Sequence, residues 1–94
     1  MPAPIKVTNN QQSSRFESEA EGHTAVLAYE IGGNRITLTH TRVPEAIAGR
    51  GIGTALVEAA LSFAREHHFQ VEPQCPFAAK YFAGHPEYQS LLAK

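Results

Sequence analysis

The chain has 94 residues, of which 43% are apolar and 18% charged, and its formal net charge is −1 at pH 7. A chain of this length forms one domain, and a charge so near zero excludes a protein that attracts nucleic acid or an anionic membrane through its overall field. No apolar run approaches the ~20 residues that span a bilayer, and the N-terminus lacks the pattern of a signal peptide, so we expect a cytoplasmic protein without nucleic-acid or membrane partners.

Residues 1–14 are rich in Pro, Asn, Gln and Ser and lack periodic apolar positions. This composition predicts a flexible N-terminal arm or an edge strand, and we expect residues 15–94 to form the single domain. The domain begins with three segments of alternating apolar and polar residues, joined by glycine-containing turns, which predict an antiparallel meander. The predicted strands are Arg15–Glu19, Thr24–Ile31 and Ile36–Val43.

The third strand is expected to have two different faces. Alternation with a period of two places His40 with Ile36 and Leu38 on one face. Thr41 and Val43 fall on the other face. The proline that follows has no amide hydrogen to donate to a neighbouring strand, so the strand ends beside it.

The chain then runs through a glycine-rich turn into an amphipathic helix. Apolar residues recur at helical spacing from Thr54 to about His67, which predicts a helix that packs on the sheet. Phe69–Gln74 reads as a fourth strand, parallel to the third, because strand, helix and strand form a crossover unit. Phe77–Ala83 and Glu87–Ala93 are short helical segments. The predicted fold class is α+β.

The turn from Gly49 to Thr54 has the chemistry of an anion site. Its glycines let a ligand approach the backbone closely, and the first amides of the helix lack partners within the helix and lie at the positive end of its dipole. Together these features favour binding of a phosphate. The other interpretation is a tight connection between strand and helix that is glycine-rich for conformational reasons alone.

Cys75 follows the fourth strand at the same edge of the sheet, where open α/β sheets bind ligands. Pro76 suits the first turn of a helix, so Cys75 takes the N-cap position, where unpaired amides stabilise a thiolate. Cys75 is therefore a candidate nucleophile or acyl acceptor. The alternative is a buried cysteine that only packs.

His40 is the candidate proton acceptor, because imidazole titrates near physiological pH and the residue lies on the strand that enters the glycine turn. A hydrogen-bonded histidine within the sheet is the alternative. His85 lies at the far end of the helix that begins after Cys75 and is too distant to touch it. One cysteine and five histidines without paired ligand spacing predict no metal site.

Several segments occur in a distinctive order along the chain. They are His40-Thr41-Arg42-Val43-Pro44-Glu45, Gly49-Arg50-Gly51-Ile52-Gly53-Thr54-Ala55-Leu56-Val57, Pro73-Gln74-Cys75-Pro76-Phe77 and His85-Pro86-Glu87-Tyr88. In this order and spacing they resemble the small single-domain GNAT-like N-acetyltransferase family. The likeness covers about residues 15–92 and implies a GNAT-like fold with acetyl-coenzyme A (acetyl-CoA) as the cofactor.

The resemblance also implies which residues hold that cofactor. The backbone of the strand that ends at Val43 would pair with the pantetheine arm, and the glycine turn would bind the pyrophosphate. The implied pyrophosphate contacts are Gly49, Arg50, Gly51, Gly53 and Thr54. The family pattern has Gln or Arg where this chain has Ala48, so a side-chain contribution must come from elsewhere, for example from Arg50.

The implied activity is transfer of an acetyl group from acetyl-CoA to an amine acceptor, a small molecule or a protein, either directly or through a thioester on Cys75. A non-catalytic module that binds or senses acyl-CoA and acts through a protein partner is the alternative, because the short frame lacks the segments that shape the acceptor pocket in larger relatives. A nucleotide-binding domain is disfavoured, since the Lys and Ser/Thr of a phosphate-binding loop are absent in the required order.

Overall fold

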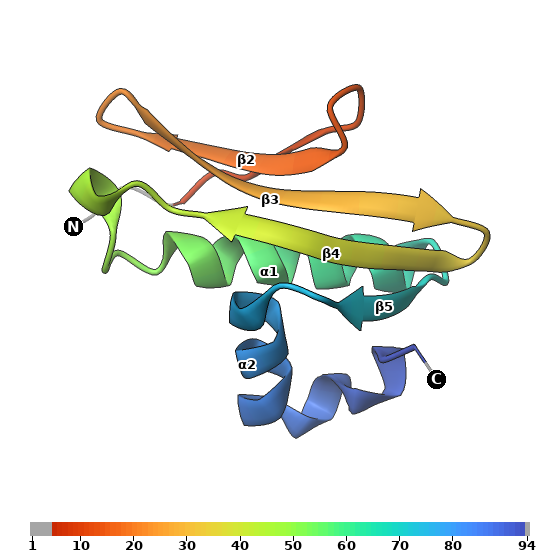
Figure 1. The fold of residues 1–94 in the computed structure, drawn as a ribbon. Helices are drawn as coiled ribbons and strands as arrows, with labels where there is room; N and C mark the ends of the chain where they lie inside the picture. Colours follow the sequence, from red (N-terminus) through yellow and green to blue (C-terminus); the bar gives the residue numbers. More distant parts are fainter. Residues whose placement is uncertain (1–4, 94) are drawn as a thin grey trace.

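The structure is a computed structural model that describes residues 5–93. The first four residues of the expected N-terminal arm, and Lys94 at the end of the expected domain, lie outside this range. The described elements are, in order, β1 (Thr8–Asn10), β2 (Arg15–Ala20), β3 (His23–Gly32), β4 (Arg35–Arg42), the 3-10 helix η1 (Glu45–Ile47), α1 (Ile52–Glu66), β5 (Gln70–Pro73), α2 (Pro76–Gly84) and the 3-10 helix η2 (Pro86–Leu91) (Figure 1).

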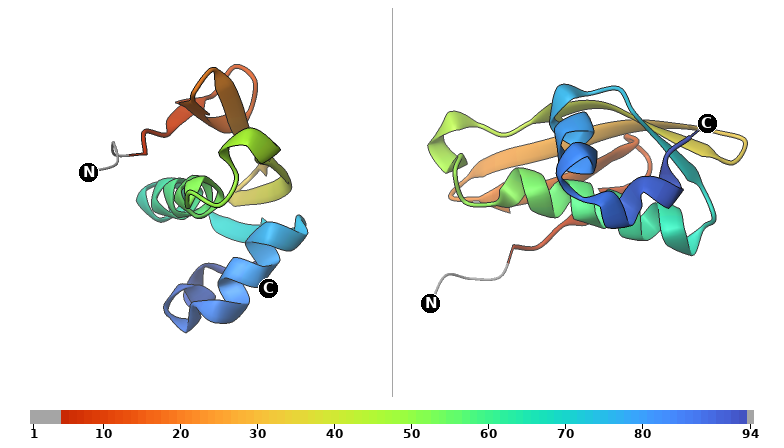
Figure 2. Two further views of the ribbon diagram at one scale, coloured as in Figure 1. Left: turned by 90° about the vertical axis from the view of Figure 1, so that its left-hand side faces the viewer. Right: turned by 90° about the horizontal axis from the view of Figure 1, so that it is seen from below.

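The strands form one sheet in chain order. β1 to β4 are antiparallel neighbours, and β5 pairs in parallel with β4. α1 makes the crossover between β4 and β5 and lies along one face of the sheet, while α2 lies beyond β5 (Figures 1 and 2). The predicted α+β class, the central helix and the parallel return strand are confirmed. α1 begins at Ile52, inside the glycine segment and earlier than predicted, because helical backbone follows directly after Gly51.

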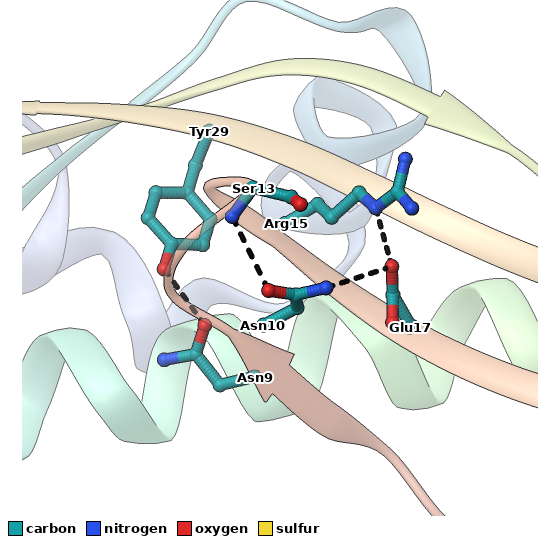
Figure 3. A network of polar contacts seen from close by, with 6 residues as sticks. All are labelled: Asn9, Asn10, Ser13, Arg15, Glu17 and Tyr29. Carbon is teal, nitrogen blue, oxygen red and sulfur yellow. Dashed lines mark hydrogen bonds and ion pairs between the residues drawn. The ribbon is translucent and has the colours of Figure 1, made fainter.

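β1 adds a fourth strand to the predicted meander of about three strands. Polar side chains hold it against its neighbours (Figure 3). The Tyr29 hydroxyl donates to Asn9 Oδ1 at 2.7 Å. The Asn10 amide donates to the carboxylate of Glu17 at 3.4 Å, and Glu17 also forms an ion pair with Arg15. Because these contacts replace apolar alternation, the segment carries no strand pattern in its sequence.

The hydrophobic core lies between the sheet and α1. The buried residues of α1 recur at three- and four-residue spacing, as they do on a helix that packs on a sheet. They are Ile52, Gly53, Leu56, Val57, Ala60, Leu61 and Ala64. Four strands contribute the large side chains opposite them, which are Phe16, Leu27, Tyr29, Ile36, Leu38 and Val71. This packing fixes the start of α1, and with it the glycine turn, relative to the end of β4.

β4 contains a register shift that changes which of its residues are buried. Ala28 of β3 pairs with His40, whereas the next residue, Tyr29, pairs with Leu38. The pairing therefore skips Thr39, as in a β-bulge. Residues directly opposite on antiparallel strands share a face of the sheet, so the single extra residue reverses the alternation beyond it.

The register shift separates His40 from the buried face. Thr41 pairs with the buried Leu27 and is half-buried, while His40 pairs with Ala28 and is exposed. The prediction that His40 shares a face with Ile36 and Leu38 was therefore wrong. Threonine alternates through this strand and is compatible with either face, so the sequence carries no mark of the bulge.

Asn9→Ala should destabilise the fold because it removes the acceptor of the Tyr29 hydroxyl, on a side chain that is only 4% exposed. An unpaired buried hydroxyl costs about 1–3 kcal/mol, which chemical denaturation can measure. Tyr29→Phe removes the hydroxyl itself. Asn9→Ala should therefore lower the free energy of unfolding much less in the Tyr29→Phe variant than in the wild type. Equal losses in both backgrounds would show that this hydrogen bond contributes nothing to stability.

Candidate functional site

The parallel pairing of β4 and β5 ends before β4 does. Leu38 is the last residue of β4 that is in register with β5, while β4 continues to Arg42 (Figure 1). The Leu38 carbonyl oxygen accepts hydrogen bonds from the amides of both Gln74 and Cys75, at 3.0 Å each, and the chain then turns into α2. The last part of β4 therefore runs past the end of β5, and we call this region the open end of the sheet.

The first turn of α1 has amides without helical partners. Gly49 and Gly51 have positive φ values of 79° and 81°, a region that disfavours other residues. Gly51 is the N-cap and supplies no side-chain cap, and Ala55 is the first residue to bond back to its carbonyl, at 3.0 Å. The amides of residues 52–54 thus lack intrahelical acceptors. Among residues 5–93, a Cβ at Gly49 would meet nothing within 4 Å, and one at Gly51 only Ile5 Cδ1 at 3.9 Å, so these residues leave the space beside both glycines open.

Gly53 has a different reason to be glycine. A Cβ at this position would lie 2.6 Å from Cζ of Phe77, because the aromatic ring fills that space. Phe77 belongs to the first turn of α2, two residues after Cys75. Their contact brings the start of α1 beside the start of α2. The backbone contact of Gly53 with a pyrophosphate stays a prediction.

Arg50 is engaged in an ion pair with Glu21, in the turn between β2 and β3. The two side chains are 49% and 63% exposed, and an exposed pair of this kind contributes about 0–1 kcal/mol. Arg50 can therefore exchange Glu21 for another anion at small cost. Val43 is half-buried just after β4, and Thr54 is exposed on the first turn of α1. The contacts of these three residues with a cofactor stay predictions.

Cys75 takes the N-cap position of α2, and its side chain is buried, with 3% exposed. Its Sγ lies 3.1 Å from Oγ1 of Thr41. A hydroxyl at this distance can accept the hydrogen of the thiol or donate its own to a thiolate. Thr41 faces Cys75 because the bulge in β4 turns it to the buried side. Sequence reasoning did not single out Thr41, since unbroken alternation gives no reason to pair it with Cys75.

The two candidate histidines lie away from the contact between Thr41 and Cys75. His40 is exposed on the opposite face of β4 from Thr41. Its role as a proton acceptor stays a prediction. His85 instead packs on its own helix, where its Nδ1 lies 2.8 Å from the Tyr81 carbonyl oxygen and its ring stacks on that of Tyr81, with 3.9 Å between centroids.

A buried tyrosine fastens α2 to α1. The Tyr81 hydroxyl donates to the Glu58 carboxylate at 2.9 Å. Burial raises the pKa of Tyr81 well above its ordinary value, and the hydrogen bond to Glu58 and the negative charge of Glu58 raise it further. Tyr81 therefore stays protonated at neutral pH and acts as a fixed link between the two helices, which keeps the start of α2 in place.

Other kinds of site can be assessed within residues 5–93. No group of three or more His, Cys, Asp and Glu side chains there is arranged to hold a metal ion. No helix in that range is both long and apolar enough to cross a membrane. A shallow hollow of about 350 Å³ lies on β1, β2 and β3 rather than at the open end of the sheet. It is lined by Lys6, Thr8, Glu17, Glu19 and Thr24.

The arrangement of the open end can be compared with known proteins. A family model described as GCN5-related N-acetyl-transferase matches residues 15–91. The chain belongs to this family. The resemblance inferred from the ordered segments is thereby confirmed, and the GCN5-related proteins are the proper comparison for both the fold and the open end of the sheet.

Relatives within the family are similar over nearly the whole chain. Mouse protein NATD1 is 40% identical over 91 residues, which cover 94% of this chain and 83% of the relative. Human protein NATD1 is 38% identical over 91 residues, which cover 94% of this chain and 80% of the relative. The NMR solution structure of a GCN5-like protein from Staphylococcus aureus has a TM-score of 0.74 at 24% identity, covering 94% of this chain and 87% of that one. This structural likeness supports the GNAT-like fold.

The stability of the protein should fall at alkaline pH through Tyr81. A phenol with a raised pKa in the folded state binds its proton more tightly than in the unfolded chain. The contribution of protonated Tyr81 to the stability of the fold is therefore complete below the ordinary pKa of 10.0. It is lost as pH rises above that value. Between about pH 9 and 11, the free energy of unfolding from denaturation experiments should fall more steeply for the wild type than for Tyr81→Phe. Parallel pH profiles for the two proteins would contradict this assignment.

Proposed function

We propose that this protein binds acetyl-CoA at the open end of its sheet and transfers the acetyl group to an amine. The observation that carries the proposal is a juxtaposition: the amides at the start of α1, which have no acceptor within that helix, lie beside the helix that begins after Cys75. Membership of the GCN5-related family supports the choice of acyl donor. To bind acetyl-CoA, the protein needs donors for the anionic pyrophosphate and a reactive group for the acyl thioester within reach of one ligand.

The residues present suit the pyrophosphate of acetyl-CoA. Backbone donors at a helix start bind phosphate well, and the space beside Gly49 and Gly51 is open to a ligand. In the proposal the pyrophosphate takes hydrogen bonds from the amides of residues 49–54, and Arg50 leaves Glu21 to add a positive charge. The backbone of β4 near Val43 pairs with the pantetheine arm, in place of the strand partner that β5 does not provide there.

Acetyl-CoA supplies an activated acyl thioester, and the residues of the open end determine how the acyl group leaves it. In the covalent route, Cys75 would give up its proton and its Sγ would take the acetyl group, while the bond from the carbonyl carbon to the sulfur of coenzyme A breaks and coenzyme A leaves as its thiol. The amine would then take the acetyl group, lose a proton and release Sγ as the thiol. The Thr41 hydroxyl orients Sγ and can donate to the thiolate. In the direct route the amine would attack the thioester carbonyl, which backbone donors of β4 would polarise, and coenzyme A would leave and take up a proton as its bond to the carbonyl carbon breaks. His40, the proton acceptor predicted from the sequence, is exposed on the face of β4 opposite to Thr41, so in this proposal it serves only the direct route, where it would take the proton of the amine.

One observation favours a second candidate function, a non-catalytic acyl-CoA binding module. Cys75 is only 3% exposed, which suits a packing role better than an encounter with acceptor molecules. Such a module would hold the cofactor through the same amides and present it to a protein partner. The two functions differ in whether the acyl group leaves the cofactor, which the next experiment measures.

Incubation with acetyl-CoA should add one acetyl group to Cys75, which mass spectrometry of intact protein and peptides can detect. Cys75→Ala should lose both this label and transfer to amines, while its affinity for acetyl-CoA is retained, because backbone amides of another segment bind the pyrophosphate. Turnover in Cys75→Ala at the wild-type rate would assign Cys75 to packing and favour direct transfer. If the wild type binds acetyl-CoA but neither carries a label nor acetylates any member of a broad amine panel, the protein is a binding module instead.

Gly51→Val should weaken binding of acetyl-CoA by about tenfold or more, because valine disfavours the positive φ of the N-cap and its side chain occupies the space that is open to the pyrophosphate. Isothermal titration calorimetry can measure the affinity. Gly33→Val is the matched control, since Gly33 also has a positive φ, of 59°, but lies in the turn before β4, at the opposite end of that strand. Wild-type affinity in Gly51→Val would overturn the placement of the pyrophosphate.

A further inference from the structure

Exposed hydrophobic side chains gather at the start of α1. Three large hydrophobic residues are exposed within residues 5–93, namely Ile5 at 40%, Ile31 at 46% and Phe77 at 41%. Two of them flank the first turn of α1: Ile5 lies next to Gly51, and Phe77 lies against Gly53. The amides of α1 that lack acceptors within the helix therefore have apolar neighbours. This combination suits a ligand that joins an anionic group to an apolar one.

The ring of Phe77 is held in a defined position. It fills the space that a Cβ at Gly53 would need, with contacts of 2.6 to 3.2 Å from that point to three of its ring carbons. The helix that carries it is anchored by buried Ala78, Tyr81 and Phe82. The ring is thus seated on one side by Gly53, while 41% of the residue remains exposed.

Phe77 also lies between the two parts of the proposed cofactor site. It touches the first turn of α1, where the pyrophosphate is placed, and it is two residues from Cys75, where the thioester is placed. In coenzyme A one methylene group separates the pyrophosphate from a carbon that carries two methyl groups, and this gem-dimethyl group lies on the thioester side. An apolar surface beside the pyrophosphate site, in the direction of Cys75, therefore meets that group.

We propose that Phe77 is a specificity residue of the acyl-CoA site. Seated on Gly53, its ring packs against the gem-dimethyl group of the pantetheine arm and so favours coenzyme A over nucleotides that offer only the pyrophosphate. This inference rests on the proposed function. It gives Gly53 a role in positioning the ring, in addition to its backbone amide.

The test compares coenzyme A with its nucleotide half, 3′-phospho-ADP, by calorimetry or competition. Phe77→Ala should weaken coenzyme A about tenfold, equivalent to about 1.4 kcal/mol, and leave 3′-phospho-ADP unchanged. Phe77→Leu, which keeps apolar bulk, should retain most of the affinity and guards against misfolding of the alanine variant. Ile31→Ala is the matched control, because Ile31 is similarly exposed but lies at the far end of β3, and it should bind both ligands like the wild type.

Gly53→Ala tests whether the contact with Gly53 positions the ring of Phe77. Its methyl group should displace Phe77 and reproduce the loss of coenzyme A affinity, and the double variant should bind no more weakly than Phe77→Ala. Unchanged coenzyme A affinity in Phe77→Ala, or an equal loss for 3′-phospho-ADP, would overturn the role of Phe77 while the proposed function stands. A wild type that binds neither acetyl-CoA nor coenzyme A would overturn the proposed function and this inference together.

Discussion

The early end of the pairing between β4 and β5 is the constraint on which the candidate site depends. The Leu38 carbonyl accepts the last ladder bond from Gln74 and also the amide of Cys75, and the next residue in register to donate to β4, Pro76, has no amide hydrogen. The chain is thereby turned out of the sheet into α2. Had β5 continued alongside β4, its backbone would occupy the edge at which we place the pantetheine arm, and Cys75 would not cap a helix.

The parts of the open end differ in how firmly they are held. The buried hydrogen bond of Tyr81 to Glu58 and the contact of Phe77 with Gly53 fix α2 against α1. By contrast, Arg50 pairs with Glu21 on the surface, where an ion pair is readily exchanged. A fixed apolar ring and an exchangeable cation suit two neighbouring parts of the proposed cofactor, the apolar start of the pantetheine arm and the charged pyrophosphate.

Local features of the chain were sufficient to predict most of the fold. Alternation, the glycine turns and the amphipathic stripe gave β2 to β5 and α1 to within a few residues, because each pattern reflects a local periodicity. β1 had no such pattern, since Asn9 and Asn10 hold it through side-chain hydrogen bonds, to Tyr29 and Glu17, rather than through apolar alternation. The bulge at Thr39 was also missed, and it moved His40 and Thr41 to faces opposite to those predicted.

The sequence by itself determined the family, the fold class, the glycine turn before α1 and the N-cap position of Cys75, because each depends on short segments and on their order along the chain. Only the tertiary structure decided that Thr41 faces the sulfur of Cys75, that Glu21 holds Arg50 and that Phe77 occupies the space beside Gly53. These contacts join residues from different elements. They follow from strand register and helix packing, which no local pattern encodes.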